Sequence, residues 1–231
     1  MPPALRRAAH LAAPVVAAGF VLLGVAACDS GTPSTPESEL SARAADGLQQ
    51  SYTATYTVAK DGAAESTLTV WRTPTSLRLD VGTASGISTS ITGPGAPVVC
   101  QSPTSGKKPT CLTVAKAGEA PPATFDPALR TVFSDSLRAF ADPNSELSVT
   151  YPTIVPTLVV PHSAGVPRCF TVSGSSQPPV AAGTYCLTEN GIPAQVEFAS
   201  GTATLTALKG APPASVFVPP VAPTPLPTPT A

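Results

Sequence analysis

An alternation of apolar and hydroxyl-bearing residues begins at Tyr52 and constrains the fold more than any other feature of the chain. Between Tyr52 and Val58 every second residue is apolar, and threonines stand between them. Successive side chains of a β-strand point to opposite faces, so this pattern predicts a strand with one buried face. Further strands are predicted around residues 68–71, 77–81, 87–92, 98–100 and 111–114. Turn signals separate these runs, which predicts an antiparallel meander with one apolar and one Thr/Ser face.

Two other stretches have the period of a helix. Thr35-Pro36 is typical of a helix start, and apolar residues then recur every fourth position up to Leu48. Asp126-Pro127 is a second such start, and the helix should end near Asp142-Pro143. Its apolar stripe consists of Leu129, Val132, Phe133, Leu137 and Phe140. We expect this stripe to lie across the apolar face of the sheet.

The second half of the chain returns to strands, and one domain accounts for the whole pattern. The predicted strands are residues 157–160, 168–173, 183–188, 192–199 and 202–208. Asn190-Gly191 is a strong hairpin signal between two of them. The domain is placed at residues 37–218, and the Pro/Thr-rich residues 219–231 are predicted to be a disordered tail.

The N-terminal region has the features of an export signal. Arg6 and Arg7 precede an apolar run that ends at Ala27, directly before Cys28. Small residues before a cysteine are typical of a bacterial lipobox, in which the cysteine is lipidated and becomes the new N-terminus. We therefore expect a signal peptide at residues 1–27, a lipidated Cys28 with a tether at residues 28–36, and an exported protein anchored on the outer face of the cell membrane. An ordinary secretory signal or a short membrane helix are the alternatives.

The other four cysteines fit an oxidising compartment. They allow three pairings, of which Cys100 with Cys111 and Cys169 with Cys186 closes the smallest loops. A metal site is disfavoured, because no C-x-x-C occurs and His162 is the one histidine beyond the signal. We therefore expect no metal and no cofactor.

Composition and motifs argue against two classes of function. With 12% charged residues, a formal net charge of −1 and no basic stripe, the chain lacks the features of a nucleic-acid-binding protein. Residues 105–108 match the S-x-x-K motif of penicillin-binding proteins, but they stand in a turn and no K-T-G or S-D-N accompanies them. A serine hydrolase is therefore a remote alternative, and no catalytic residue is predicted.

Two segments carry a resemblance to a known family. The stretch from Trp71 to Arg78, WRTPTSLR, follows a helix and a strand, and the stretch from Gly183 to Pro193, GTYCLTENGIP, contains a cysteine hairpin. In these features the chain resembles the LolA/LolB-like lipoprotein-carrier superfamily, in particular actinobacterial lipobox lipoproteins. The resemblance implies an α+β fold in which a curved antiparallel sheet, a half-barrel, holds one or two helices on its concave apolar face.

The same resemblance implies an apolar cavity and a lipid or lipoprotein ligand. The candidate lining residues are Trp71, Leu129, Phe133, Leu137 and Phe140, and the alternative is that these residues form a filled core. The expected function is to bind or help traffic an apolar or lipid ligand in the cell envelope, as a monomer. The alternative is a non-enzymatic scaffold or sensor that binds another protein.

Overall fold

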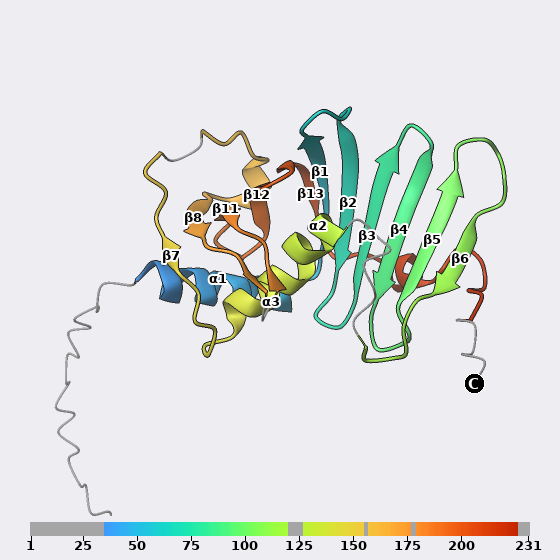
Figure 1. Ribbon diagram of the computed structural model, residues 1–231, viewed down its shortest axis with the longest axis horizontal. Helices are drawn as coiled ribbons and strands as arrows, with labels where there is room; N and C mark the ends of the chain where they lie inside the picture. The colour runs from blue at the N-terminus through green and yellow to red at the C-terminus, as the bar shows by residue number, and fades with distance from the viewer. Residues whose placement is uncertain (1–34, 120–126, 155–156, 177–178, 226–231) are drawn as a thin grey trace, which may run out of the picture. The chain divides into compact units, whose positions relative to one another are not determined.

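Eleven strands form one open antiparallel sheet in the computed structural model (Figure 1). The structure describes residues 35–119, 127–154, 157–176 and 179–225. The strand order is β6-β5-β4-β3-β2-β1-β13-β12-β11-β8-β7, so the last long strand returns to pair with the first. With helices on one face, this confirms an α+β fold built on an antiparallel sheet.

The strands of the first half agree with the sequence prediction. They are β1 (Tyr52–Lys60), β2 (Ser66–Arg72), β3 (Leu77–Thr83), β4 (Gly86–Thr92), β5 (Val98–Pro103) and β6 (Thr110–Thr113). The second half contributes β7 (Val149–Thr150), β8 (Arg168–Val172), β11 (Gly183–Leu187), β12 (Pro193–Phe198) and β13 (Gly201–Lys209). A small separate ladder joins β9 (Ser175–Ser176) to β10 (Pro179–Val180).

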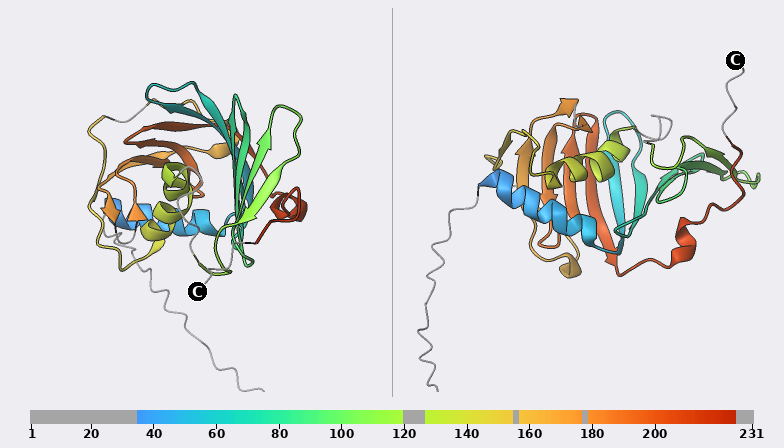
Figure 2. Two further views of the ribbon diagram at one scale, coloured as in Figure 1. Left: turned by 45° about the vertical axis from the view of Figure 1, so that its right-hand side comes forward. Right: turned by 90° about the horizontal axis from the view of Figure 1, so that it is seen from below.

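Two helices lie on the same face of the sheet, which curves around them (Figure 2). The first is α1 (Pro36–Gln49), where the Thr35 hydroxyl accepts a hydrogen bond from the amide of Ser38, as expected for an N-cap. The second is continuous over α2 (Pro127–Arg130), the π-helical turn η1 (Thr131–Asp135) and α3 (Ser136–Ala141). Short 3-10 turns occur at η2 (His162–Ala164) and η3 (Ala214–Phe217). We call the face that carries α1 and α3 the helix-side face, and the opposite one the outer face.

Apart from Arg72, the helix-side face is apolar over β1 to β3, and it becomes polar at β4. Directly opposite residues of paired strands share a face, and the register places Val70 opposite Leu79 and Leu79 opposite Ser90. Ser88 and Thr92 join Ser90 on the helix-side face. The prediction of one continuous apolar face is therefore wrong at β4, whose isoleucines point to the outer face.

The C-terminal segment covers the outer face of β5 and β6. Val221 packs against Val98 and the Cys100–Cys111 pair, while the amide of Thr224 donates to the carbonyl of Cys111. Earlier in the segment, the carbonyl of Val216 accepts a hydrogen bond of 2.7 Å from Arg78. The prediction of a free tail from residue 219 is therefore wrong for residues 219–225. Residues 226–231 lie outside the described part of the chain.

One predicted strand is not formed. Residues 157–160 have no ladder partner, because the surrounding prolines lack the amide hydrogens that a ladder needs. Leu158 and Val160 instead pack partly against the Cys169–Cys186 pair. The short β7, which pairs with β8, takes the edge position in the sheet.

Both disulfides that close the smallest loops are present. Cys100 pairs with Cys111 and Cys169 pairs with Cys186, each joining residues directly opposite on neighbouring strands. The two bonds lie near opposite ends of the sheet, at β5–β6 and at β8–β11. The predicted disulfide framework is confirmed.

The export signal, Cys28 and nearly all of the tether fall outside the described residues, so the lipobox and the anchor stay predictions. Within residues 35–225, apart from the gaps given above, no helix is long and apolar enough to cross a membrane.

A contact between two glycines joins α1 to the β11–β12 turn. A Cβ on Gly47 would overlap the carbonyl of Gly191, and Gly191 itself has a φ of 72°. On helix propensity alone, Gly47→Ala would stabilise the protein by about 1 kcal/mol. We expect it instead to destabilise the protein by about 1–3 kcal/mol, because backbone atoms must separate.

Denaturant unfolding measures this difference. Gly210→Ala is the matched control, since nothing lies within 4 Å of its Cβ position, and it should be nearly neutral. A stabilised Gly47→Ala variant would show that the helix and the turn do not meet as described.

Candidate functional site

Four of the predicted cavity residues fill the core. Leu129, Phe133, Leu137 and Phe140 are all buried, each exposed by at most 3%. The ring of Phe133 meets that of Tyr56 edge to face, with their centroids 4.8 Å apart. The structure therefore brings these four residues together as packed side chains, as the alternative of a filled core expects.

Trp71 lies elsewhere, which corrects its assignment to the same cavity. It alternates with the buried Val70 and Arg72 along β2, so it points to the outer face. There the guanidinium of Arg78 lies 5.0 Å from its ring centroid. Arg78 also forms a two-pronged ion pair with Asp80 at 2.7 and 2.8 Å. Trp71 is thus part of an outer-face cluster and does not face the helices.

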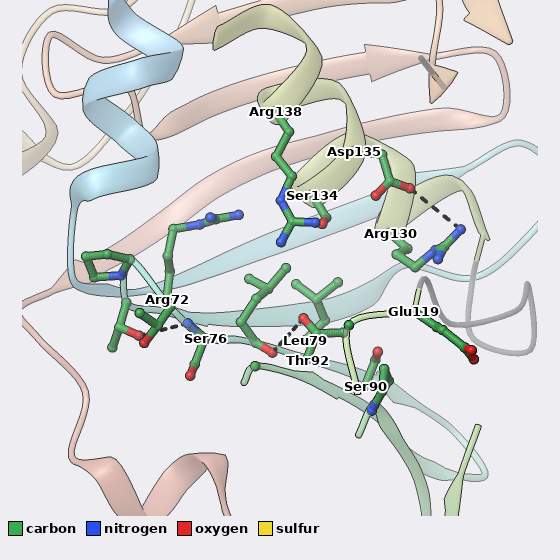
Figure 3. A pocket seen from close by; sticks show the side chains of 17 residues that line it. Arg72, Ser76, Leu79, Ser90, Thr92, Glu119, Arg130, Ser134, Asp135 and Arg138 are labelled. Carbon is green, nitrogen blue, oxygen red and sulfur yellow. Dashed lines mark hydrogen bonds and ion pairs between the residues drawn. The ribbon is translucent and has the colours of Figure 1, made fainter. Parts of the chain in front are cut away.

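An open hollow of about 320 Å³ lies beside the buried stripe, between the helix and β2 to β4 (Figure 3). We call it the arginine pocket. Its floor includes Leu77 and Leu79, and its walls include hydroxyl groups from both the sheet and the helix. The charged residues that line it are Arg72, Arg130, Arg138, Asp135 and Glu119.

Arg72 is the buried member of the pocket. It stands on the helix-side face in line with Tyr52 and Leu77, and it is 4% exposed. Its Nη2 donates a hydrogen bond of 2.7 Å to the carbonyl oxygen of Phe133, while its Nε has no hydrogen-bond partner. Burial raises the pKa of Tyr52, and the charge and hydrogen bond of Arg72 offset part of that rise.

The π-helical turn supplies the opposite wall of the pocket. The amide of Ser136 donates to the carbonyl of Thr131, five residues earlier, where an α-helix would pair residues four apart. Around this turn, Ser134, Asp135 and Arg138 all line the pocket. Figure 3 shows the Arg138 side chain extending from the helix toward the sheet, and Arg72 lines the same pocket from the sheet.

Among the described residues that line the pocket, basic side chains outnumber acidic ones by one. Asp135 pairs with Arg130, with 3.6 Å between Nη2 and Oδ2. Glu119 accepts a hydrogen bond from the amide of Lys116. Among the described residues neither Arg72 nor Arg138 forms an ion pair with a carboxylate. The pocket is therefore a cationic hollow with an apolar floor.

On the other side of the helix, a buried tyrosine network is complete. The Tyr185 hydroxyl donates to the carbonyl of Ala181 at 2.9 Å, and it lies 3.1 Å from the Ser136 hydroxyl, which can donate to it. Burial raises the pKa of Tyr185 to about 12, although the Ser136 contact opposes this. The hydroxyls of Tyr185 and Ser136 are therefore hydrogen-bonded within the core, and we assign them a structural role.

The remaining sequence candidates do not assemble into a site. Ser105 and Lys108 of the S-x-x-K match lie exposed in the β5–β6 turn, and His162 is exposed in η2. Within the described residues no three His, Cys, Asp or Glu side chains gather as a metal site would require.

Comparison with known proteins adds no family to this description. No protein-family model matches the chain, and no curated protein is significantly similar to it.

Mutation of Phe133 tests whether its side chain is packed in a filled core. Phe133→Ala should lower the free energy of unfolding by about 3–5 kcal/mol, because it removes buried apolar surface and leaves a cavity. Phe217→Ala, at a half-buried residue of η3, is a matched control and should cost clearly less. Denaturant unfolding of both variants decides the point, and equal losses would contradict the filled core.

Proposed function

We propose that this chain is an exported binding protein, held on the outer face of the membrane by lipid on Cys28, whose ligand is an amphiphile. The ligand occupies the helix-side face of the sheet, and the protein carries it or presents it within the cell envelope. The observation that supports this most directly is the arginine pocket, an open hollow with aliphatic side chains at its floor and cationic groups around it.

The size and composition of the pocket fit a ligand with both apolar and polar parts. Its volume of about 320 Å³ falls within the usual range of small-molecule sites, which combine apolar lining with a few polar groups. Leu77 and Leu79, 5% and 1% exposed, lie under the pocket as its apolar floor, and Arg138 at the mouth supplies a charge without a carboxylate partner among the described residues.

A second, more apolar hollow lies between α1 and α3. It measures about 440 Å³ and is bordered by Leu40, Phe140, Leu147 and Val149. Side chains fill the space between the sheet and the helix of residues 127–141. An acyl chain would therefore lie in surface hollows such as this one and not between the helix and the sheet. An open curved sheet with helices on one face is also the arrangement implied by the resemblance to LolA/LolB-like carriers, which supports the same class of function.

One observation favours the alternative of a scaffold or sensor. The connection from β7 to β8 exposes Ile154, Val159 and Val166 by 83%, 87% and 74%. Several large apolar side chains exposed along one connecting segment fit a surface that binds another protein. This segment is a candidate contact surface if the protein serves as a scaffold.

Lipid analysis of the protein purified from its native membrane separates the two functions. We expect an amphiphile in near-equimolar amount after extraction and mass spectrometry, beyond the lipid attached to Cys28. A protein that carries none, but retains a partner protein through Ile154, Val159 and Val166, would contradict the binding function and support the scaffold.

The anchor is tested separately with Cys28→Ser. Removing the lipidated cysteine should leave the protein unprocessed or released, because its stable membrane attachment is lost. Cell fractionation and mass measurement of the N-terminus follow the change. A variant that is still processed and membrane-bound would contradict the lipobox interpretation.

A further inference from the structure

The arginine pocket contains a buried positive charge that the described residues do not neutralise. Arg72 is 4% exposed, and one of its hydrogen bonds goes to the neutral carbonyl of Phe133. Tyr52, its other neighbour, keeps its proton because burial raises the pKa of the phenol. A buried charge is costly unless a counter-charge stabilises it, so this arrangement favours an anion nearby.

The two acids of the pocket do not meet that need. Asp135 interacts with Arg130 at 3.6 Å, and Glu119 bonds to the backbone of its own turn. Neither pairs with Arg72 or with Arg138. Two guanidinium groups, one buried in the sheet and one exposed on the helix, therefore line the same hollow, and neither has a carboxylate partner in the part of the chain that the structure describes.

Hydroxyl groups surround the same hollow from both walls. Ser76 lines it from the β2–β3 turn, Ser90 from β4, and Ser134 from the π-helical turn. Hydroxyls donate hydrogen bonds to anions, and guanidinium groups bind phosphate with paired, charge-assisted hydrogen bonds. Donors that approach from two walls suit a tetrahedral group, whose oxygens point in several directions, better than a planar carboxylate.

We infer that the arginine pocket is a phosphate site, and that the ligand presents a phosphate group to Arg72 and Arg138. The inference rests on the proposed function, since it names the polar end of the proposed amphiphile. A phosphate could also arrive as a free anion, and the two sources share this chemistry. Leu77 and Leu79 at the pocket floor favour the amphiphile.

Matched ligands test the inference on the full chain carrying Cys28→Ser, purified in a non-ionic detergent. The probes are dihexanoyl phosphatidic acid, dihexanoylglycerol, which has the same chains without phosphate, and inorganic phosphate. Binding is measured by isothermal titration calorimetry at two salt concentrations. We expect phosphatidic acid to bind at least about tenfold more tightly than dihexanoylglycerol, and its affinity to fall as salt rises.

Arg138→Gln is the decisive variant, because Arg138 is exposed and its loss should not disturb the fold. It should weaken phosphatidic acid about tenfold and leave dihexanoylglycerol unchanged. Arg168→Gln is the matched control: it removes the same charge from a side chain 54% exposed on β8, outside the pocket, and should change neither affinity.

Each outcome bears on a different claim. If inorganic phosphate binds as tightly as phosphatidic acid and depends equally on Arg138, the phosphate site stands and the amphiphile of the proposed function is contradicted. If both lipids bind equally and Arg138→Gln has no effect, the phosphate site is overturned and the proposed function stands. Failure of all three probes to bind also overturns the phosphate site, and the lipid extraction described above then decides the proposed function.

Discussion

Phe133 connects the helix to the sheet through both its ring and its backbone. The ring packs edge to face on Tyr56 of β1, while the carbonyl accepts a hydrogen bond of 2.7 Å from Arg72 of β2. The first contact excludes water from the core, and the second fixes the helix along its axis. Phe133 lies within the π-helical turn that begins at Thr131, so the helix departs from regular α-geometry where this bond is made.

The same attachment creates the pocket beside the core. Arg72 reaches the helix only because β2 places it on the helix-side face, in a row that also contains Tyr52 and Leu77. One strand further, Ser90 and Thr92 interrupt the apolar residues of that face and line the hollow, while Val99 of β5 belongs to the core again. The boundary between core and pocket is thus set by the register of β3 with β4.

Local signals in the sequence predicted most of the fold. The Thr35-Pro36 start, the stripe from Leu129 to Phe140 and the alternation from Tyr52 are contained within single elements, and the structure has them as predicted. The facing of β4 could not be predicted in this way, because Ile87, Ile91 and the serines alternate equally well in either orientation. On the neighbouring β5 and β6 the outer face is also apolar, and there the C-terminal segment, far along the chain, covers it through Val221 and Thr224.

The site was harder to predict than the fold. The alternation of Leu68, Val70 and Arg72 does place the arginine on the buried face, and a charge at a core position is the signal that could have indicated a site. Arg72 borders a hollow because of two features from other parts of the chain, the helix of residues 127–141 and the polar residues of β4. No single segment of the sequence contains this information. The sequence analysis assigned the apolar stripe of residues 129–140 to a cavity because residues that fill a core and residues that line an apolar cavity are of the same types.

The C-terminal segment shows how composition can mislead about order. Its prolines cannot form a regular ladder, which is typical of an extended tail. Yet Val221 has an apolar surface to pack on, made by Val98 and the disulfide of Cys100 with Cys111.

Thr224 then bonds to the open edge of β6 through both its amide and its carbonyl. An edge strand with unpaired backbone groups invites pairing with another chain, and here the protein's own segment satisfies part of that edge. The order of this segment thus arises from the edge it covers, so it follows from the tertiary structure and not from local preference.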